Sequence, residues 1–362
     1  MPEIMKNKLF ILIITLMCSS CVCAAQTLML DTEVPDTSIA IIGYFCKNDS
    51  MMFRKTYSKI KVEKGDTIVD DAFTEDFLIV VTDSTSNGYR MNLIPVAFDY
   101  SEESDSIHRM MQVKLSELSK DLVCEFTTDE LGRVQNIINW REIRDKMKVG
   151  IKGMCDTLYS TAPFLNDIMP RKQVENTLLM RFSTEQGVRE AYNELNELFG
   201  LHGNVFDIGD TEFDTQANGY PMHVTASIGY NPVEDEDNDF DGDYSIISKS
   251  VTTVPIEDIL DLGLGNMGLM MTDALSDTLA NHRKEMLDSI TAAMPDGSNN
   301  INIINNEYYG YFFNGWPKEC YNQKTSGLGG LGERIETTHI EWIMRRWYLV
   351  IFEDEEQPSH KI

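Results

Sequence analysis

Segments in which side chains alternate with a period of two recur along this sequence, and they constrain its fold more than any other feature. Residues 55–63 alternate in this way, and residues 77–82 and 89–98 are rich in β-branched and aromatic side chains. Successive side chains of a strand point to opposite faces of a sheet, so this pattern is typical of strands. The Asn87-Gly88 pair between the last two segments favours the positive φ angles of a tight turn. The pattern therefore predicts an antiparallel hairpin here.

Helical patterns lie mainly in the middle of the chain. Asn139 stands three residues before Glu142, which is the spacing of a capped helix start. Residues 184–199 carry one apolar stripe that ends at Gly200, and residues 256–294 are mostly helical in pattern. Further strands are predicted at residues 122–127, 134–138, 220–230, 244–254, 301–313, 319–323 and 335–351.

The order of these segments predicts an α+β fold, with a mainly antiparallel sheet of hairpins packed with helices from the middle of the chain. A length of 362 residues is enough for one large core or two ordinary ones. We expect a signal peptide at 1–25, a strand-rich N-terminal α+β region at 26–162 and a C-terminal α+β region at 163–362. One continuous domain is the alternative.

The N-terminal segment has the order of a secretory signal. Two lysines precede an apolar run at residues 9–17, and small residues then lead to Ala25. Cleavage after Ala25 is one prediction, and lipidation of Cys21, which follows two serines, is the other. No other apolar run is long enough to cross a membrane, so the mature chain is expected to have no transmembrane segment. This secretory signal predicts an exported protein of the periplasm, the outer envelope or the extracellular medium.

Charge and cysteine content limit the partners. The formal net charge is −27, which repels nucleic acid and anionic headgroups and leaves a neutral ligand or an envelope protein as the expected partner. Four cysteines lie beyond the signal segment: Cys46, Cys124, Cys155 and Cys320. Their spacing allows three complete disulfide pairings, and four free thiols are equally consistent with it.

An acidic loop resembles the start of a calcium-binding loop. Asp237, Asp239 and Asp241 stand at alternate positions, Gly242 follows, and Asp243 stands where such loops use a backbone carbonyl. The pattern ends there, because Ser248 occupies the position of the usual bidentate Glu. The loop therefore predicts a calcium site at these four aspartates, and a solvated acidic turn is the alternative.

An aromatic segment near the C-terminus offers a second candidate site. Residues 308–317 place rings on both faces of a predicted strand and end in an Asn-Gly turn. Tyr309, Tyr311 and Trp316 are the candidate ligand platform, because Tyr and Trp combine an apolar ring with a polar group. Packing of the same rings in the core is the alternative.

The sequence resembles a group of uncharacterised exported proteins of anaerobic Gram-negative bacteria. The resemblance rests on Asn139 to Arg144, on Asn314 to Pro317 and on Trp347. It implies an exported, strand-rich protein, and it brings no catalytic residues with it.

Catalytic patterns are sparse. The six histidines stand singly, and none forms a paired metal-ligand spacing. We therefore expect a non-enzymatic ligand-binding module of the cell envelope, with no cofactor other than calcium. A protein-interaction or structural component of the envelope is the first alternative. A hydrolase whose site is assembled from distant segments is the second.

Overall fold

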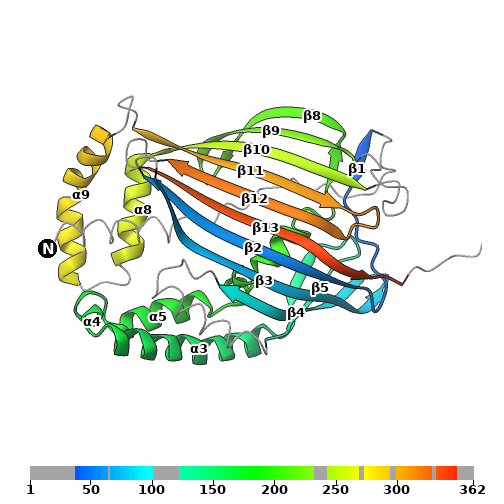
Figure 1. Ribbon diagram of the computed structural model, residues 1–362, viewed down its shortest axis with the longest axis horizontal. Coiled ribbons are helices and arrows are strands. Elements are labelled where there is room, and N and C mark those ends of the chain that lie inside the picture. Colours follow the sequence, from blue (N-terminus) through cyan, green and yellow to red (C-terminus); the bar gives the residue numbers. More distant parts are fainter. Residues whose placement is uncertain are drawn as a thin grey trace, which may run out of the picture.

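The structure is a computed structural model, and it describes residues 37–63, 66–100, 122–231, 243–268, 273–293, 299–327 and 332–348. Its main feature is one antiparallel sheet of 11 strands, which fills the centre of Figure 1. A separate two-stranded sheet lies at one end of the molecule. The helices lie at the edges of the large sheet and behind it.

The strands of the large sheet are β2 (Ser50–Glu63), β3 (Asp66–Thr85), β4 (Gly88–Tyr100), β5 (Cys124–Thr128), β6 (Val134–Ile137), β8 (Gly209–Ala217), β9 (Tyr220–Tyr230), β10 (Tyr244–Pro255), β11 (Asn300–Tyr311), β12 (Pro317–Gly327) and β13 (Glu333–Arg346). The small sheet pairs β1 (Ser38–Ala40) with β7 (Val205–Asp207). The helices are α3 (Trp140–Thr161), α4 (Leu165–Ile168), α5 (Arg171–Arg181), α6 (Glu185–Ala191), α7 (Asn193–Phe199), α8 (Ile256–Gly268) and α9 (Asp273–Ala293).

Two meanders meet at the centre of the sheet. The strand order is β6-β5-β4-β3-β2-β13-β12-β11-β10-β9-β8. Within each half, β2 to β6 and β8 to β13, neighbouring strands are consecutive in the chain, and the pairing of β2 with β13 joins the two halves. Their pairing runs from Glu333 opposite Val62 to Arg346 opposite Ser50. The N-terminal and C-terminal regions thus share one sheet, and a boundary at residues 162–163 does not separate two sheets.

The predicted α+β class is wrong. Strands predominate, and the middle of the chain does not supply central helices on which hairpins pack. The alternating segments were identified as strands, but local periodicity contains no information about pairing between segments far apart in the chain. Nearly all the strands join a single sheet, and α3, α4 and α5 lie along its lower edge in Figure 1.

The sheet has two unequal faces. The inner face carries the main core, in which Met51 and Phe53 of β2 lie opposite Ile79 and Phe77 of β3, all fully buried. The outer face carries the intervening residues, such as Arg54, and no helix stands in front of it in Figure 1. Helices α6 and α7 supply the buried residues that complete the core on the inner side: Val188, Leu195, Leu198 and Phe199.

Contacts of α7 require the sheet to curve. This helix of 7 residues is roughly 10 Å long, yet it contacts both β6 and β12. The two strands are six positions apart in the strand order, which corresponds to about 29 Å in a flat sheet. The sheet therefore bends around α7, and the inner face is concave.

Local helix signals were only partly correct. Asn139 precedes α3 as predicted, but its side chain makes no cap hydrogen bond. Instead its Oδ1 accepts from the Glu125 N–H at 3.0 Å and its Nδ2 donates to the Val123 carbonyl at 2.8 Å, which ties the helix start to β5. The predicted helix at 184–199 is two helices that meet at Tyr192, and the Thr184 hydroxyl accepts from the Gly187 N–H.

A tight turn closes the end of β11 against the segment that precedes β2. Trp316 is fully buried there, and its ring centroid lies 4.6 Å from that of Phe45. Gly315 has a φ of +77°, and a Cβ at this position would lie 2.1 Å from the carbonyl oxygen of Ile42. The turn thus requires glycine for both its backbone angle and its close approach.

Gly315→Ala is expected to destabilise the protein much more than Gly219→Ala. Both glycines have positive φ, but nothing lies within 4 Å of a Cβ at Gly219. Gly219→Ala should cost about 1 kcal/mol for its backbone angle alone, whereas Gly315→Ala should cost roughly 3 kcal/mol or more because a backbone clash is added. Urea denaturation of the two variants measures the difference. Equal losses would contradict the close packing of this turn.

Candidate functional site

The inner face changes character along the direction of the strands. Beyond the apolar pair of Phe53 and Phe77, the next inward position on β2 is Lys55, which lies opposite Glu75 of β3. The position after that pairs Tyr57 with Phe73. The inner face therefore passes from a core to an ionic layer and then to an aromatic cluster.

The ionic layer is buried under α7. Lys55 Nζ donates to Glu194 Oε1, and the two side chains are only 11% and 10% exposed. Glu197, also on α7, adds a second carboxylate beside Lys55. Glu307 of β11 lies near Glu197, and its carboxylate accepts hydrogen bonds from the side chains of Ser248, Asn305 and Asn322 at 3.0, 2.8 and 3.2 Å.

Burial of this layer favours protonated carboxyl groups. Desolvation, reinforced by the charge of Glu194, raises the pKa of Glu75 to about 8, although Lys55 opposes the shift. Desolvation also raises the pKa of Glu197 to about 7. For Lys55, burial disfavours the charge, but the carboxylates of Glu194, Glu197 and Glu75 outweigh it and raise the pKa. Near neutral pH the layer thus holds a charged lysine and at least one carboxyl group close to its titration point.

Four aromatic rings form a cluster on the inner face next to the ionic layer. The ring centroids of Tyr57 and Phe73 are 5.1 Å apart, those of Phe73 and Tyr100 are 6.1 Å apart, and those of Phe98 and Tyr100 are 6.4 Å apart. Tyr100 lies opposite Phe73 in the register, which places the cluster on three adjacent strands. All four rings are partly exposed. They can therefore contact an apolar group of a ligand, whereas the rings of the core are fully buried.

The predicted ligand platform lies deeper in the structure. Tyr311 and Trp316 are 1% and 0% exposed, and Tyr309 packs against the same core. The structure brings the three residues together on the inner side. It places Tyr308, the next residue along β11, on the outer face opposite Tyr321 of β12. Whether a ligand reaches Tyr309, Tyr311 and Trp316 stays a prediction for binding measurements.

Most of the predicted calcium loop lies outside the described residues, namely Asp237, Asp239 and Asp241. Asp243 is described and is 3% exposed. Its carboxylate accepts from the Phe313 N–H at 3.0 Å and pairs with Lys318 Nζ at 3.3 Å. The described residues contain no group of three or more His, Cys, Asp and Glu side chains arranged to hold a metal ion. Calcium binding by the loop stays a prediction.

The described histidines lie in separate places. His202 is buried in the core, where burial lowers its pKa to about 4 and its Nε2 lies 2.8 Å from the Gly315 carbonyl oxygen. His223 is on β9 beside Asp214 of β8, at 2.9 Å. His339 of β13 lies 2.7 Å from Glu319 of β12, on the outer face. A hydrolytic site assembled from distant segments stays an untested alternative.

Among the cysteines that the structure describes, Cys124, Cys155 and Cys320 are free thiols. Burial raises the pKa of the Cys124 and Cys320 thiols. Both are therefore held neutral beside the ionic layer, where they contribute as apolar side chains.

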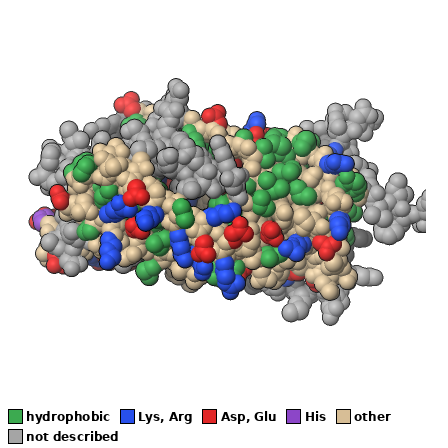
Figure 2. Space-filling model, turned by 90° about the horizontal axis from the view of Figure 1, so that it is seen from below, with side chains coloured by type: hydrophobic (Ala, Val, Ile, Leu, Met, Phe, Trp, Pro, Cys, Tyr) green, Lys and Arg blue, Asp and Glu red, His purple; other side chains and the backbone are tan. Residues whose placement is uncertain are grey.

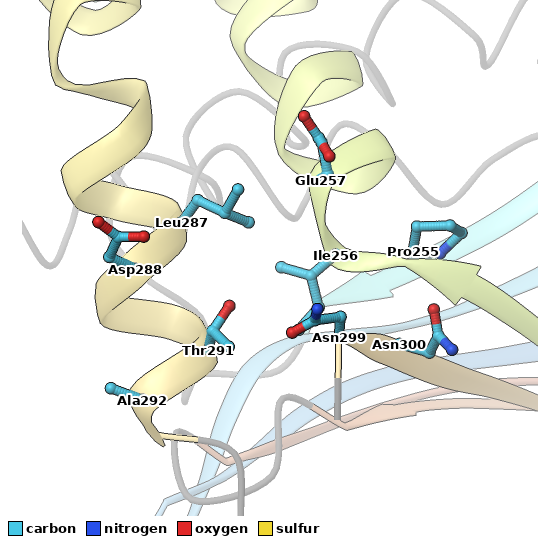
Figure 3. Close-up of a pocket in the computed structure, with 9 residues that line it drawn as sticks. All are labelled: Pro255, Ile256, Glu257, Leu287, Asp288, Thr291, Ala292, Asn299 and Asn300. Carbon is cyan, nitrogen blue, oxygen red and sulfur yellow. The ribbon is translucent and has the colours of Figure 1, made fainter. Parts of the chain in front are cut away.

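A separate cavity of about 490 Å³ lies between α8, α9 and the start of β11. Ile256 from the start of α8 and Leu287 from α9 point toward each other across it (Figure 3). Ile256 also packs with Ile290 and Ile301 in a small apolar cluster. Glu257 and Asn300 add polar groups to the cavity lining.

Two solved structures bear a distant likeness to this chain. No protein-family model and no curated protein matches the sequence. A structure of lipovitellin that concerns lipid-protein interactions is 7% identical, covers 86% of this chain and 26% of that chain, and has a TM-score of 0.39. An outer membrane lipoprotein-sorting protein domain from Vibrio parahaemolyticus is 8% identical, covers 84% and 88%, and has a TM-score of 0.14. The chain thus spans about a quarter of the lipovitellin chain.

None of the described helices is both long and apolar enough to cross a membrane.

Sequence reasoning missed the ionic layer and the aromatic cluster. Alternation in residues 55–63 correctly placed Tyr57 and Lys59 on one side of a strand, but it did not show that this side faces inward. The signal that could have found them is on the neighbouring strand. There Glu75 lies opposite Lys55 with the opposite charge, and Phe73 lies opposite Tyr57 with a second ring. Such cross-strand pairs can be sought once a register is assumed.

Lys55→Met is expected to destabilise the protein by about 3–5 kcal/mol, because it leaves Glu194 buried without its cation. The double variant Lys55→Met with Glu194→Leu should recover most of that loss. Arg54→Met is the matched control, since Arg54 is the next residue along β2 and its ion pair with Asp76 is on the outer face. Its effect should be much smaller. Denaturation curves of the four proteins measure the pattern, and an unrecovered double variant would contradict it.

Stability should fall as the pH rises from 5 to 8.5. The fold raises the pKa of Glu75 to about 8 and of Glu197 to about 7, above the ordinary value of 4.5. The folded protein thus binds these protons more tightly than the unfolded chain, so their contribution is full below pH 4.5 and disappears by about pH 8. The expected loss is roughly 2 kcal/mol or more.

The double variant Glu75→Gln with Glu197→Gln should flatten this dependence. Glu190→Gln, on the exposed side of α6, is the matched control and should keep the slope of the original protein. Urea denaturation at each pH measures the free energy of unfolding. A double variant with an unchanged slope would show that other groups cause it.

Proposed function

We propose that this protein is a non-enzymatic binding module that holds an apolar or amphiphilic ligand on the inner face of its sheet. The single observation that supports the proposal most is the aromatic cluster of Tyr57, Phe73, Phe98 and Tyr100. These rings lie on the concave side, at the edge of the core, and stay partly exposed. Concave surfaces with exposed rings and a few polar groups are typical of ligand sites.

The surroundings of the cluster favour an uncharged or amphiphilic ligand. Lys55 Nζ lies 5.9 Å from the centroid of the Phe73 ring, and its charge is already engaged by Glu194. Asn322 is level with Tyr57 through Thr338 of β13, and Asn305 faces inward one position further along; their amide nitrogens donate to Glu307. An apolar chain could lie along the rings while a polar group contacts these amides. A net charge of −27 makes a strongly anionic ligand unfavourable.

The cell envelope is the proposed place of action. The basic residues, apolar run and small residues of the first 25 positions support export. Cleavage after Ala25 and lipidation of Cys21 stay the two alternatives, and calcium binding by residues 237–243 stays a further proposal. A protein-interaction role is the competing function, and it would use the outer face rather than the inner one.

Binding of the neutral fluorescent probe N-phenyl-1-naphthylamine tests the proposed site. Phe73→Ala should raise the dissociation constant about tenfold, because one ring of the cluster is worth roughly 1.5 kcal/mol or more of apolar contact. Tyr321→Ala is the matched control, since Tyr321 is a partly exposed ring on the outer face. It should leave the affinity unchanged. Fluorescence titration of the three full-length proteins gives the constants.

Two outcomes would contradict the proposed site. Equal effects of Phe73→Ala and Tyr321→Ala would mean that the probe does not distinguish the inner face of the sheet from the outer face. No saturable binding by the original protein would remove the ligand-binding proposal and leave protein interaction as the better one. Circular dichroism of each variant confirms that a lost signal does not arise from unfolding.

A further inference from the structure

The helical segment below the sheet reverses the charge of the rest of the chain. Residues 140–181, which form α3, α4 and α5, contain eight Lys and Arg and five Asp and Glu, whereas the whole chain contains 31 and 58. These helices lie together along the lower edge in Figure 1. The segment therefore has a net charge of +3 on a strongly acidic protein.

The same segment exposes apolar side chains. Met180, Val149 and Phe164 are 74%, 68% and 60% exposed, and they are three of the four most exposed large hydrophobic side chains among the described residues. Their neighbours in the sequence bury the apolar side of the segment, where Ile151 and Val174 join α3 to α5. Exposed apolar side chains on a segment that already has its own core are not needed for folding.

Basic and apolar side chains share the exposed sides of α3 and α5, where Asp145 and Asp156 of α3 are exposed as well. Lys148, Val149 and Lys152 are exposed and lie within one helical turn of each other on α3. Lys172 and Met180 are both exposed on α5 and are two turns apart. Figure 2, which views the molecule from the side of α3, shows Lys and Arg side chains spread over this surface, with both acidic and hydrophobic side chains between them.

Several basic side chains of these helices form ion pairs, among them Arg144 with Asp145 at 2.9 Å and Arg171 with Asp156 at 2.5 Å. Lys146 pairs with Glu142 at 3.0 Å, and Lys148 pairs with Asp145 at 3.2 Å. All four side chains are more than 40% exposed, so the pairs are solvated and weak. A surface with a high density of negative charge can replace them at little cost.

We propose that α3, α4 and α5 form a docking surface for an anionic lipid bilayer. Lysines at such a surface are attracted to anionic headgroups, and exposed Phe, Met and Val side chains insert at the headgroup boundary. The same bilayer repels the acidic remainder of the protein. The protein is therefore expected to face the lipid with α3, α4 and α5. The proposal goes beyond ligand binding and holds whether or not the inner face takes a ligand.

Flotation with lipid vesicles tests the docking surface. The full chain should bind vesicles of phosphatidylcholine with phosphatidylglycerol at low salt, and binding should weaken strongly in 0.5 M NaCl. The triple variant Lys148→Glu, Lys152→Glu and Lys172→Glu should bind at least tenfold more weakly, since each basic residue at the surface contributes roughly fivefold. Vesicles of phosphatidylcholine alone measure any contribution from the N-terminal apolar run.

A charge-matched control separates local from overall charge. The variant Lys47→Glu, Lys249→Glu and Lys284→Glu changes three exposed lysines in other parts of the molecule and alters the net charge equally. It should lose much less affinity than the α3 and α5 variant. Equal losses in the two variants, or no binding of the original chain to anionic vesicles, would overturn the proposal.

The apolar contribution has its own variant pair. Phe164→Ser with Met180→Ser should reduce binding several-fold, whereas Tyr230→Ser with Ile247→Ser should not. The latter pair removes two large hydrophobic side chains that are 58% and 54% exposed on the other half of the molecule. An equal loss in both pairs would show that exposed apolar side chains anywhere on the chain suffice, and it would contradict a defined docking surface.

Discussion

The hydrogen-bonded pairing of β2 with β13 holds the two halves of the molecule in one sheet. It joins residues separated by more than half of the chain, for example Ile60 with Ile335 and Lys55 with Ile340. Without this ladder the chain would have two smaller meanders, each with an extra open edge. With it, the inner face is wide enough to wrap around α7 and continues beyond that helix. The core, the ionic layer and the aromatic cluster all lie on strands that this pairing aligns.

Burial of charge on the inner face follows from that alignment. Lys55 points to the same side as the core residues Met51 and Phe53 because the strand alternates without interruption. A lysine in this place is tolerable only because β3 and α7 bring Glu75 and Glu194 to it. The layer therefore adds specificity to the docking of α7, since a shifted helix would leave charges without partners. The packing of α7 also depends on pH, because burial in this layer raises the pKa of Glu75 to about 8 and that of Glu197 to about 7.

Two surfaces with different chemistry result from this architecture. The concave inner face combines rings and amides at the edge of the core, which suits an apolar or amphiphilic ligand. The segment α3 to α5 lies outside the sheet, has its own small core and carries the basic and apolar side chains proposed to meet a bilayer. If both proposals hold, one protein presents a ligand site and a lipid-docking surface on separate elements, each of which can be altered without the other.

Local patterns in the sequence determined most of the strands and the apolar stripe of residues 184–199, because alternation and helical spacing depend only on near neighbours. They did not predict β1, β7 and β8. They did not determine which side of a strand is buried, because a period of two is the same for either choice. Lys55 and Lys59 are buried, while Ile60 on the same strand faces outward. That choice and the single sheet depend on contacts between distant segments, and the contact of Tyr57 with Phe73 depends on the register of the β2–β3 hairpin. Only the tertiary structure decides them.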